Sequence, residues 1–291
     1  MAHELKVNYG SKIDEVLRVD LVTKDEVIFN TFYEGDAKAG AVRIPVRDDE
    51  VEVADYDKTD ITNNKVKYGA TKYITAVIDN DKFVNEYIDG YEADAVPDNI
   101  KAQRVTSAGY SLASTIDTTA LKTLVNAVKG LDKAGNTYTD LRAGKTGTKV
   151  TATKSLFNDI VSCTVALDNA GVPAEGRYAI VTPEAYGDLV KSDDFVKASD
   201  LGQELVRTGA VGMVNGVAVY KSAKLAGIDA NITAIVGHYN FATRIEAWQA
   251  EPQLFDGSTD ANIVGGSLLK GRKVYTHEVT KPQAFAYRSA E

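Results

Sequence analysis

The residue types that most often carry metal chemistry are few in this chain and are not grouped. The three histidines, His3, His238 and His277, lie in separate segments. None has a companion ligand at the short spacing that zinc sites use. We therefore expect no metal site, and we interpret the histidines as isolated residues of the surface or of hairpins.

A phosphate-binding loop is suggested by one short string, Gly144-Lys145-Thr146. The complete motif needs a glycine five residues before Gly144, but residue 139 is a threonine. The segment in front of the string, Tyr138–Leu141, is also too short and polar for the buried strand that precedes such loops. We interpret the string as part of a loop rich in Lys and Thr, and we expect no cofactor.

Nucleophilic and acid–base catalysis are not indicated either. No serine is framed as G-x-S-x-G, and Cys163 lies among apolar residues of an expected helix, where thiols are inert. Adjacent acids such as Asp48 and Asp49 occur in polar segments, where they form turns or solvated faces. Without a pocket that shifts a pKa they carry no mechanism. We therefore expect a protein that is not an enzyme.

The composition is that of a globular protein. The chain has 291 residues, of which 44% are hydrophobic and 25% charged, enough for one large domain or two intertwined ones. A formal net charge of −8 disfavours tight phosphate contacts but is compatible with enclosing DNA loosely. The N-terminus lacks the apolar core of a signal peptide, and no apolar run reaches bilayer length. With a single cysteine, we expect folding in a cytoplasm and no membrane association.

The first half of the chain predicts an arm, a projecting hairpin and a long helix. Residues 1–40 carry short apolar patches broken by charge, as in an arm. Period-two patterns at 41–56 and 66–79 predict strands, and the polar stretch Asp55–Lys67 between them predicts a hairpin that leaves the body. Helical spacing is expected after Asn80, with a long amphipathic helix from Pro97 to Val128.

A break in that helix is expected at Gly109 or within Thr115–Thr119. The Gly-, Thr- and Lys-rich composition of residues 130–154 predicts a loop or a flexible hairpin. A second helix is expected from Leu156 to Leu167, and Pro183 should open a third. The Asn215-Gly216 pair is the strongest hairpin signal in the chain. Further strands are expected at Tyr178–Val181, Ile232–Val236, Ala242–Trp248 and Val274–Val279.

In this order the segments resemble the major capsid proteins of tailed bacteriophages, whose Hong Kong 97-like shell fold is also used by encapsulins and herpesvirus capsids. VRIPVRDDEVEVADYD (Val42–Asp57) with KYITAVIDNDKFV (Lys72–Val84) is similar to the strands that flank the E-loop of that family. AQRVTSAGYSLASTIDTTALKTL (Ala102–Leu124) is similar to its spine helix. LDNAGVPAEGRYAIVTPEAYGDLVKSDDF (Leu167–Phe195), followed by GAVGMVNGVAVYKS (Gly209–Ser222), resembles its axial domain and is the most specific of the three.

The resemblance implies an α+β chain in four parts. These are an N-terminal arm at 1–40, the E-loop hairpin with its flanking strands at 41–84, a peripheral domain and an axial domain. The peripheral domain would cover 85–154, including the spine helix, and take return strands from about 240–291; the axial domain would cover 155–240 and contain a mixed sheet.

The function implied is self-assembly into hexamers and pentamers of an icosahedral capsid around double-stranded DNA. The protein would then be part of the virion, assembled in the host bacterial cytoplasm, with scaffolding, portal and decoration proteins as further partners. DNA would be enclosed without sequence-specific binding. The arm lacks a long coiled-coil pattern, so we expect a scaffold to be a separate protein or to be absent.

All candidate site residues are therefore candidates for subunit contacts: Arg43, Arg47, Asp57, Asp60, Lys65, Lys67, Val214 and Asn215. We expect the hairpin tip, Asp57–Lys67, to contact a neighbouring subunit, and the two arginines to pair with acids across that contact. The segment Gly209–Ser222 is expected near the axis of the capsomer. Exposed strands are poor features of a monomer but suit a subunit that overlaps its neighbours.

Three other functions are compatible with parts of the pattern. An encapsulin-like shell would have the same fold but enclose protein cargo. A phage tail-tube or decoration protein would be mostly β and would lack the long helix that ends at Val128. An α/β enzyme would need a concave site with perturbed acids or a nucleophile.

Overall fold

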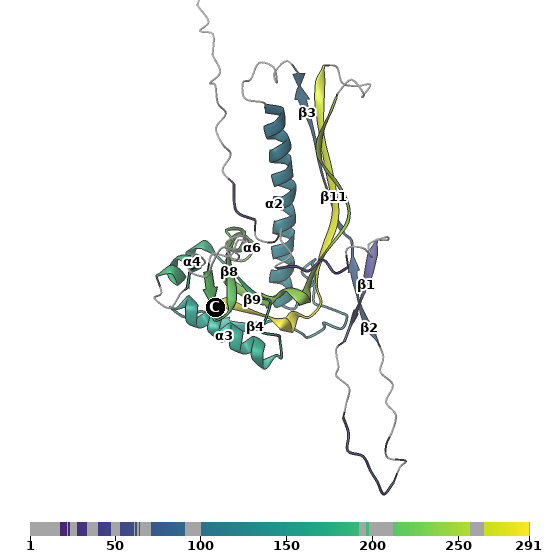
Figure 1. Cartoon of the computed structure of the whole chain (residues 1–291), viewed down its shortest axis with the longest axis vertical. Helices are drawn as coiled ribbons and strands as arrows, with labels where there is room; N and C mark the ends of the chain where they lie inside the picture. The colour runs from purple at the N-terminus through teal and green to yellow at the C-terminus, as the bar shows by residue number, and fades with distance from the viewer. Residues whose placement is uncertain are drawn as a thin grey trace, which may run out of the picture.

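The computed structural model describes residues 18–21, 23, 28–33, 40–47, 53–60, 62, 64, 71–90, 100–191, 196–197, 212–256 and 265–290. These residues form an elongated unit, a compact unit at its base, and a two-stranded ribbon near the junction of the two (Figure 1). Within the described ranges, no helix is both long and apolar enough to cross a membrane.

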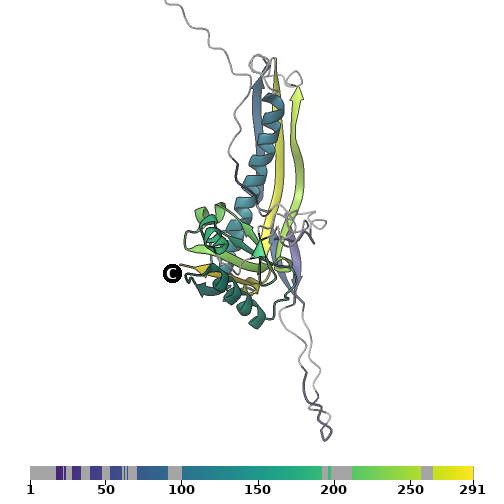
Figure 2. The same ribbon diagram turned by 60° about the vertical axis from the view of Figure 1, so that its left-hand side comes forward.

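The elongated unit is one long helix that lies along a three-stranded antiparallel sheet. Its elements are α2 (Ile100–Val128) and, in sheet order, β10 (Ala242–Asp256), β11 (Gly266–Val279) and β3 (Asn80–Asp89). Ala108 of α2 packs with Ile88 and Leu269 of the sheet. Figures 1 and 2 show α2 on one side of the three strands, so the helix leaves the opposite face of this sheet uncovered.

The compact unit is built on a mixed seven-stranded sheet of order β4-β12-β9-β5-β8-β7-β6. Its strands are β4 (Thr148–Thr151), β5 (Arg177–Val181), β6 (Val196–Lys197), β7 (Gly212–Val214), β8 (Val217–Lys221), β9 (Ile232–His238) and β12 (Phe285–Ser289). Its helices are α3 (Leu156–Asn169), α4 (Pro183–Val190), α6 (Lys224–Ile228), η4 (Tyr239–Phe241) and η6 (Pro282–Ala284). β5 is buried along its full length, as expected of a central strand with both faces covered.

Local sequence signals account for several element ends. The side chain of Ser155 caps α3, and that of Thr182 caps α4, where Pro183 occupies the first turn. Asn215 and Gly216 have φ angles of 47° and 78°, the left-handed values that a two-residue hairpin turn requires. The predicted second and third helices and the predicted hairpin at this pair are therefore confirmed.

The ribbon follows the predicted alternation. β1 (Ala41–Val46) pairs antiparallel with β2 (Lys72–Val77). One face of the ribbon is buried against Ile245 of β10 and two partly buried side chains, Tyr33 and Leu141. The other face carries exposed residues, so the period of two directs one set of side chains to the body and the other to solvent.

Two predictions about regular elements were wrong. The residues after Asn80 form strand β3 rather than the start of a helix. α2 is continuous from Ile100 to Val128, with no break at Gly109 or within Thr115–Thr119. The threonines bond back to carbonyls one turn earlier, which satisfies their hydroxyls inside the helix. Pro97 lies outside the described residues.

The expected division into parts also needs correction. Ile28 and Phe29 are buried in the main core, so this end of the expected arm belongs to the body of the protein. The boundary at residue 84 falls inside β3. β4 and β12, which were assigned to the peripheral domain, form one side of the seven-stranded sheet because β12 pairs with both β4 and β9.

Three side chains with reactive groups are buried. Burial raises the pKa of the Cys163 thiol to about 12, which confirms the prediction of an inert thiol. Of the predicted surface or hairpin positions of the histidines, His277 does lie in the β10–β11 hairpin, although it is buried there, and the prediction was wrong for His238, which is buried at the end of β9. His238 contacts the carbonyl of Glu175 through Nε2 (2.6 Å) and accepts from the N–H of Asn240. His277 packs edge-on against Phe29.

Acidification should destabilise the subunit through His277. Burial, together with the positive charges of Arg244 and Lys133, lowers the pKa of His277 to about 3. The unfolded chain therefore binds the extra proton below about pH 6.5, and stability falls as the pH drops from there toward 3. Relative to His277→Phe, the wild type should lose about 2 kcal/mol more between pH 7 and pH 5. Urea unfolding at the two pH values measures this difference; equal losses in both proteins would contradict it.

Candidate subunit-contact surfaces

The loop beyond the ribbon exposes apolar side chains to solvent. Val53 is 93% exposed and Tyr56 is 66% exposed. In Figures 1 and 2, the described residues 53–60 lie far from the body, on the side away from the three-stranded sheet. Exposed apolar residues on a projection are not covered by the fold of their own chain, so this loop is a candidate contact surface.

Polar bonds give this loop a local shape without a core. The carboxylate of Asp57 accepts bonds from the N–H groups of Thr59 (2.8 Å) and Asp60 (3.1 Å). The side chain of Asn64 bonds both backbone groups of Asp57 across the loop, at 2.9 and 3.0 Å. Asp60 in turn accepts two bonds from Thr62, and these bonds lower its pKa. The loop tip is thus preorganised by turn-forming side chains.

The predicted contact residues fall in two places. Asp57 and Asp60 lie in this loop, and the exposed Arg43 and Arg47 lie at its base. Neither arginine makes an ion pair with another described residue. Lys65 and Lys67 lie outside the described residues. The structure therefore brings four of the eight residues to one projection, while their role in contacts stays a prediction.

The other two residues lie in the compact unit, at the β7–β8 turn. Asn215 is exposed there. Val214 is 1% exposed and belongs to the main core, which corrects the expectation that its side chain offers a contact. Side chains of β7 alternate between the two faces of the sheet, and Val214, the last residue before the turn, falls on the face that points into the core.

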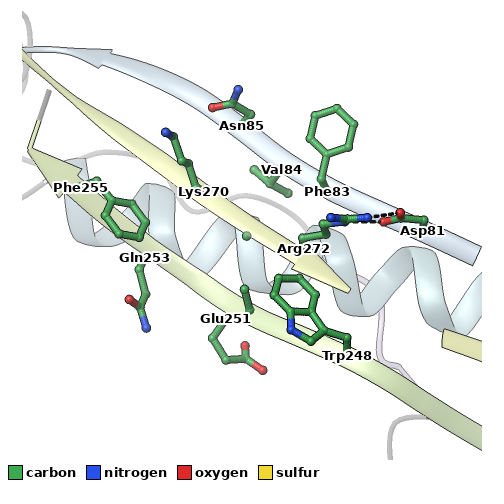
Figure 3. Close-up of a pocket in the computed structure, with 12 residues that line it drawn as sticks. Asp81, Phe83, Val84, Asn85, Trp248, Glu251, Gln253, Phe255, Lys270 and Arg272 are labelled. Atoms are coloured by element: carbon green, nitrogen blue, oxygen red, sulfur yellow. Dashed lines mark hydrogen bonds and ion pairs between the residues drawn. The ribbon is translucent and has the colours of Figure 1, made fainter. Parts of the chain in front are cut away.

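A groove on the uncovered face of the three-stranded sheet was not predicted. Its walls come from β3, β10 and β11 and include three aromatic side chains, Phe83, Trp248 and Phe255 (Figure 3). Phe83 is 72% exposed and Trp248 is 52% exposed. The outward-facing side chains of β3 recur with a period of two, but two of them, Phe83 and Tyr87, are aromatic. β3 therefore lacks the polar–apolar alternation by which a half-buried strand is recognised in a sequence, and it was not predicted as a strand.

Two cations of β11 lie inside this groove. Arg272 donates to both carboxylate oxygens of Asp81 through Nε and Nη2, and its guanidinium lies 5.6 Å from the centre of the Trp248 ring. The bond from Arg272 lowers the pKa of Asp81. The ammonium of Lys270 lies 6.0 Å from the Phe255 ring. Arg272 is thus already neutralised by Asp81, and Lys270 is the cation of the groove that makes no ion pair with another described residue. The groove can therefore hold an apolar or aromatic side chain, with Lys270 beside it to attract a carboxylate.

The search against family models found no match, and no curated protein matches this chain in sequence. Solved structures do match. The capsid structure of the cyanophage P-SCSP1u superposes with a TM-score of 0.71 at 17% identity, covering 99% of this chain and 93% of that one. The mature capsid of bacteriophage PhiM1 gives 0.64 at 17% identity over 98% and 91% of the two chains. The capsid of an empty GTA particle gives 0.65 at 15% identity over 98% and 95%.

At this level of identity the likeness establishes the fold. The chain has the Hong Kong 97-like fold of phage capsid proteins over nearly its whole length, so the fold class predicted from the sequence is confirmed.

Proposed function

We propose that this chain is a major capsid protein, a structural subunit whose activity is self-assembly rather than catalysis. The observation that carries the proposal is a pair of complementary surfaces that one chain cannot bring together. The loop at 53–60 exposes Val53 and Tyr56, and the groove exposes Trp248 and Phe83. The two surfaces lie toward opposite ends of the molecule (Figure 1). Each therefore needs a second copy to be covered.

Charge supports the same pairing. The loop carries Asp55, Asp57 and Asp60 beside one lysine, Lys58. In the groove, Arg272 is paired with Asp81 and Glu251 with Lys273, so the positive charge offered to the loop is that of Lys270, which makes no ion pair with another described residue. Opposite charges on two surfaces steer association and fix the register of the contact. A contact between different surfaces of identical chains is head-to-tail, and repeating it around an axis closes a ring.

The likeness to capsid structures supports a shell subunit, and the finer parts of the proposal extend that role. The rings would be hexamers and pentamers that close an icosahedral shell around double-stranded DNA in a virion. Assembly would take place in the host bacterial cytoplasm, with scaffolding, portal and decoration proteins as further partners. The turn at Asn215 would lie toward the ring axis. The long helix α2 and the mixed sheet argue against a tail-tube or decoration protein, which we expected to be mostly β.

Replacing the two apolar residues of the loop should stop assembly. In the double variant Val53→Ser with Tyr56→Ser, both changed side chains are exposed in the single chain, so the fold should be unaffected. Each contact loses an apolar anchor, and we expect the assembled fraction to fall at least tenfold. Negative-stain microscopy and mass photometry measure it.

The matched control is Val165→Ser, which removes a 51% exposed valine from α3, away from both surfaces. This control should assemble like the wild type. Normal particles from the loop double variant would show that the loop is not a contact, and a wild type that stays monomeric under all assembly conditions would overturn the proposed function.

A further inference from the structure

The direction of the ribbon is set where the chain turns from β2 into β3, at Ile78 and Asp79, which we call the corner. Only Ile78 and Asp79 separate β2 of the ribbon from β3 of the long sheet. The N–H of Ile78 donates to the carbonyl of Gly40 (2.9 Å), the residue directly before the other ribbon strand, β1. The ribbon can therefore change its angle to the elongated unit mainly by rotation at this corner.

The ammonium group of Lys133 makes most of the side-chain bonds at the corner, where the hydroxyl of Thr276 also donates to Asp79 (3.3 Å). Nζ of Lys133 donates to the carbonyl of Val77 (2.9 Å) and to Oγ1 of Thr276 (2.7 Å), and lies 3.4 Å from Oδ1 of Asp79. A second carboxylate, that of Glu278, lies 3.5 Å away. All three ammonium hydrogens are thus directed to partners on β2, the corner and β11. The Lys133 side chain is 20% exposed, so these bonds are partly shielded from water.

Lys133 itself is fixed to the end of the long helix. It lies in a tight turn in which the N–H of Asp132 donates to the carbonyl of Asn136 (2.7 Å). The side chain of Asn126, in the last turn of α2, donates to the carbonyl of Asp132 (3.1 Å). The ammonium therefore connects the end of α2 to the base of the ribbon through a short and well-bonded path.

The apolar packing under the ribbon constrains the angle between the ribbon and the elongated unit less strictly than the hydrogen bonds of Lys133 do. Val42, Ile44 and Ile74 rest on Ile245 through apolar contacts, which are non-directional. Hydrogen bonds depend steeply on angle, so the bonds at the corner define one orientation.

We infer that Lys133 is a positioning residue that sets the angle of the projecting ribbon, and thereby the size of the shell that the subunit builds. The second half of this inference rests on the proposed function. If the loop contacts a neighbour, the ribbon angle determines how far each subunit is rotated relative to the next. A change at the corner then changes the curvature of the shell without touching either contact surface.

The test compares Lys133→Met, which keeps the aliphatic stem, with Lys133→Arg, which keeps the charge. Lys129→Met is the matched control, because it breaks the ion pair with Asp229 near the same end of α2 but does not reach the corner. The first readout is hydrogen exchange of the Ile78 amide in dissociated subunits. The second is the diameter distribution of assembled particles by electron microscopy.

We expect Lys133→Met to accelerate exchange of the Ile78 amide by about tenfold or more. Its particles should be heterogeneous in diameter or incomplete. Lys133→Arg should restore both readouts in part, and Lys129→Met should match the wild type. Unchanged exchange in Lys133→Met would overturn the positioning role. Faster exchange with particles of wild-type diameter would overturn the link to shell size. Failure of the wild type to assemble contradicts the proposed function alone, since exchange is measured in subunits.

Discussion

Trp248→Asp should abolish shell formation while the subunit stays folded. Trp248 is the largest aromatic side chain of the groove, and half of its surface is exposed in the single chain. Buried tryptophans in interface pockets contribute about 2 kcal/mol or more to a contact. The aspartate would also place a negative charge opposite the acidic loop of the neighbour. A ring contains one such contact per subunit, so the losses accumulate around the ring.

The measurement is the assembled fraction of Trp248→Asp by mass photometry, with unfolding by circular dichroism to verify the fold. Val165→Asp introduces the same charge at a similarly exposed apolar position on α3 and should still assemble. If Trp248→Asp forms shells at wild-type concentrations, the groove does not receive a neighbouring subunit. If both variants fail, net charge rather than the groove controls assembly.

Asp117→Ala should lower the free energy of unfolding by about 3–5 kcal/mol, because it removes the carboxylate partner of the partly buried Lys224 and the acceptor of two buried bonds from Thr23. Asp117 of α2 is 1% exposed and lies 3.2 Å from Nζ of Lys224. Its other oxygen accepts two bonds from Thr23, from the backbone N–H (2.9 Å) and from the hydroxyl (2.7 Å). The single carboxylate therefore joins the N-terminal segment, the long helix and α6.

Urea unfolding of the dissociated subunit measures the effect. Asp117→Asn keeps an acceptor for Thr23 but loses the charge opposite Lys224, so its loss should lie between that of the wild type and that of the alanine variant. Lys191→Ala, which removes an exposed ion pair with Asp188, should change stability by less than about 0.5 kcal/mol. A loss below 1 kcal/mol for Asp117→Ala would mean that the carboxylate does not join these segments.

Sequence patterns predicted the elements whose determinants are local. The alternation of β1 and the helix that begins at Leu156 depend on nearby residues alone. The hairpin at Asn215 could be predicted because its two-residue turn needs left-handed backbone, which the Asn-Gly pair adopts readily. The order of these elements carried the resemblance to capsid proteins, and that resemblance predicted the fold class.

What the sequence could not predict depends on partners that are distant in the chain. Thr23 and Asp117 are 94 residues apart, and Lys133 and Thr276 are 143 apart. Nothing near Asp117 or His277 in the sequence marks either side chain as buried. The groove was missed for another reason: its aromatic residues are exposed in the single chain, and under the proposed function a neighbour covers them. An assembly surface resembles a core in its residue types, so it obscures the polar–apolar alternation of the strand that carries it.

The most direct test of self-assembly is electron cryomicroscopy of particles formed by the purified wild-type protein. We predict closed icosahedral shells in which residues 53–60 of each subunit lie against Trp248 and Phe83 of the next. A protein that remains a compact monomer, or shells in which this loop extends into solvent, would contradict the account.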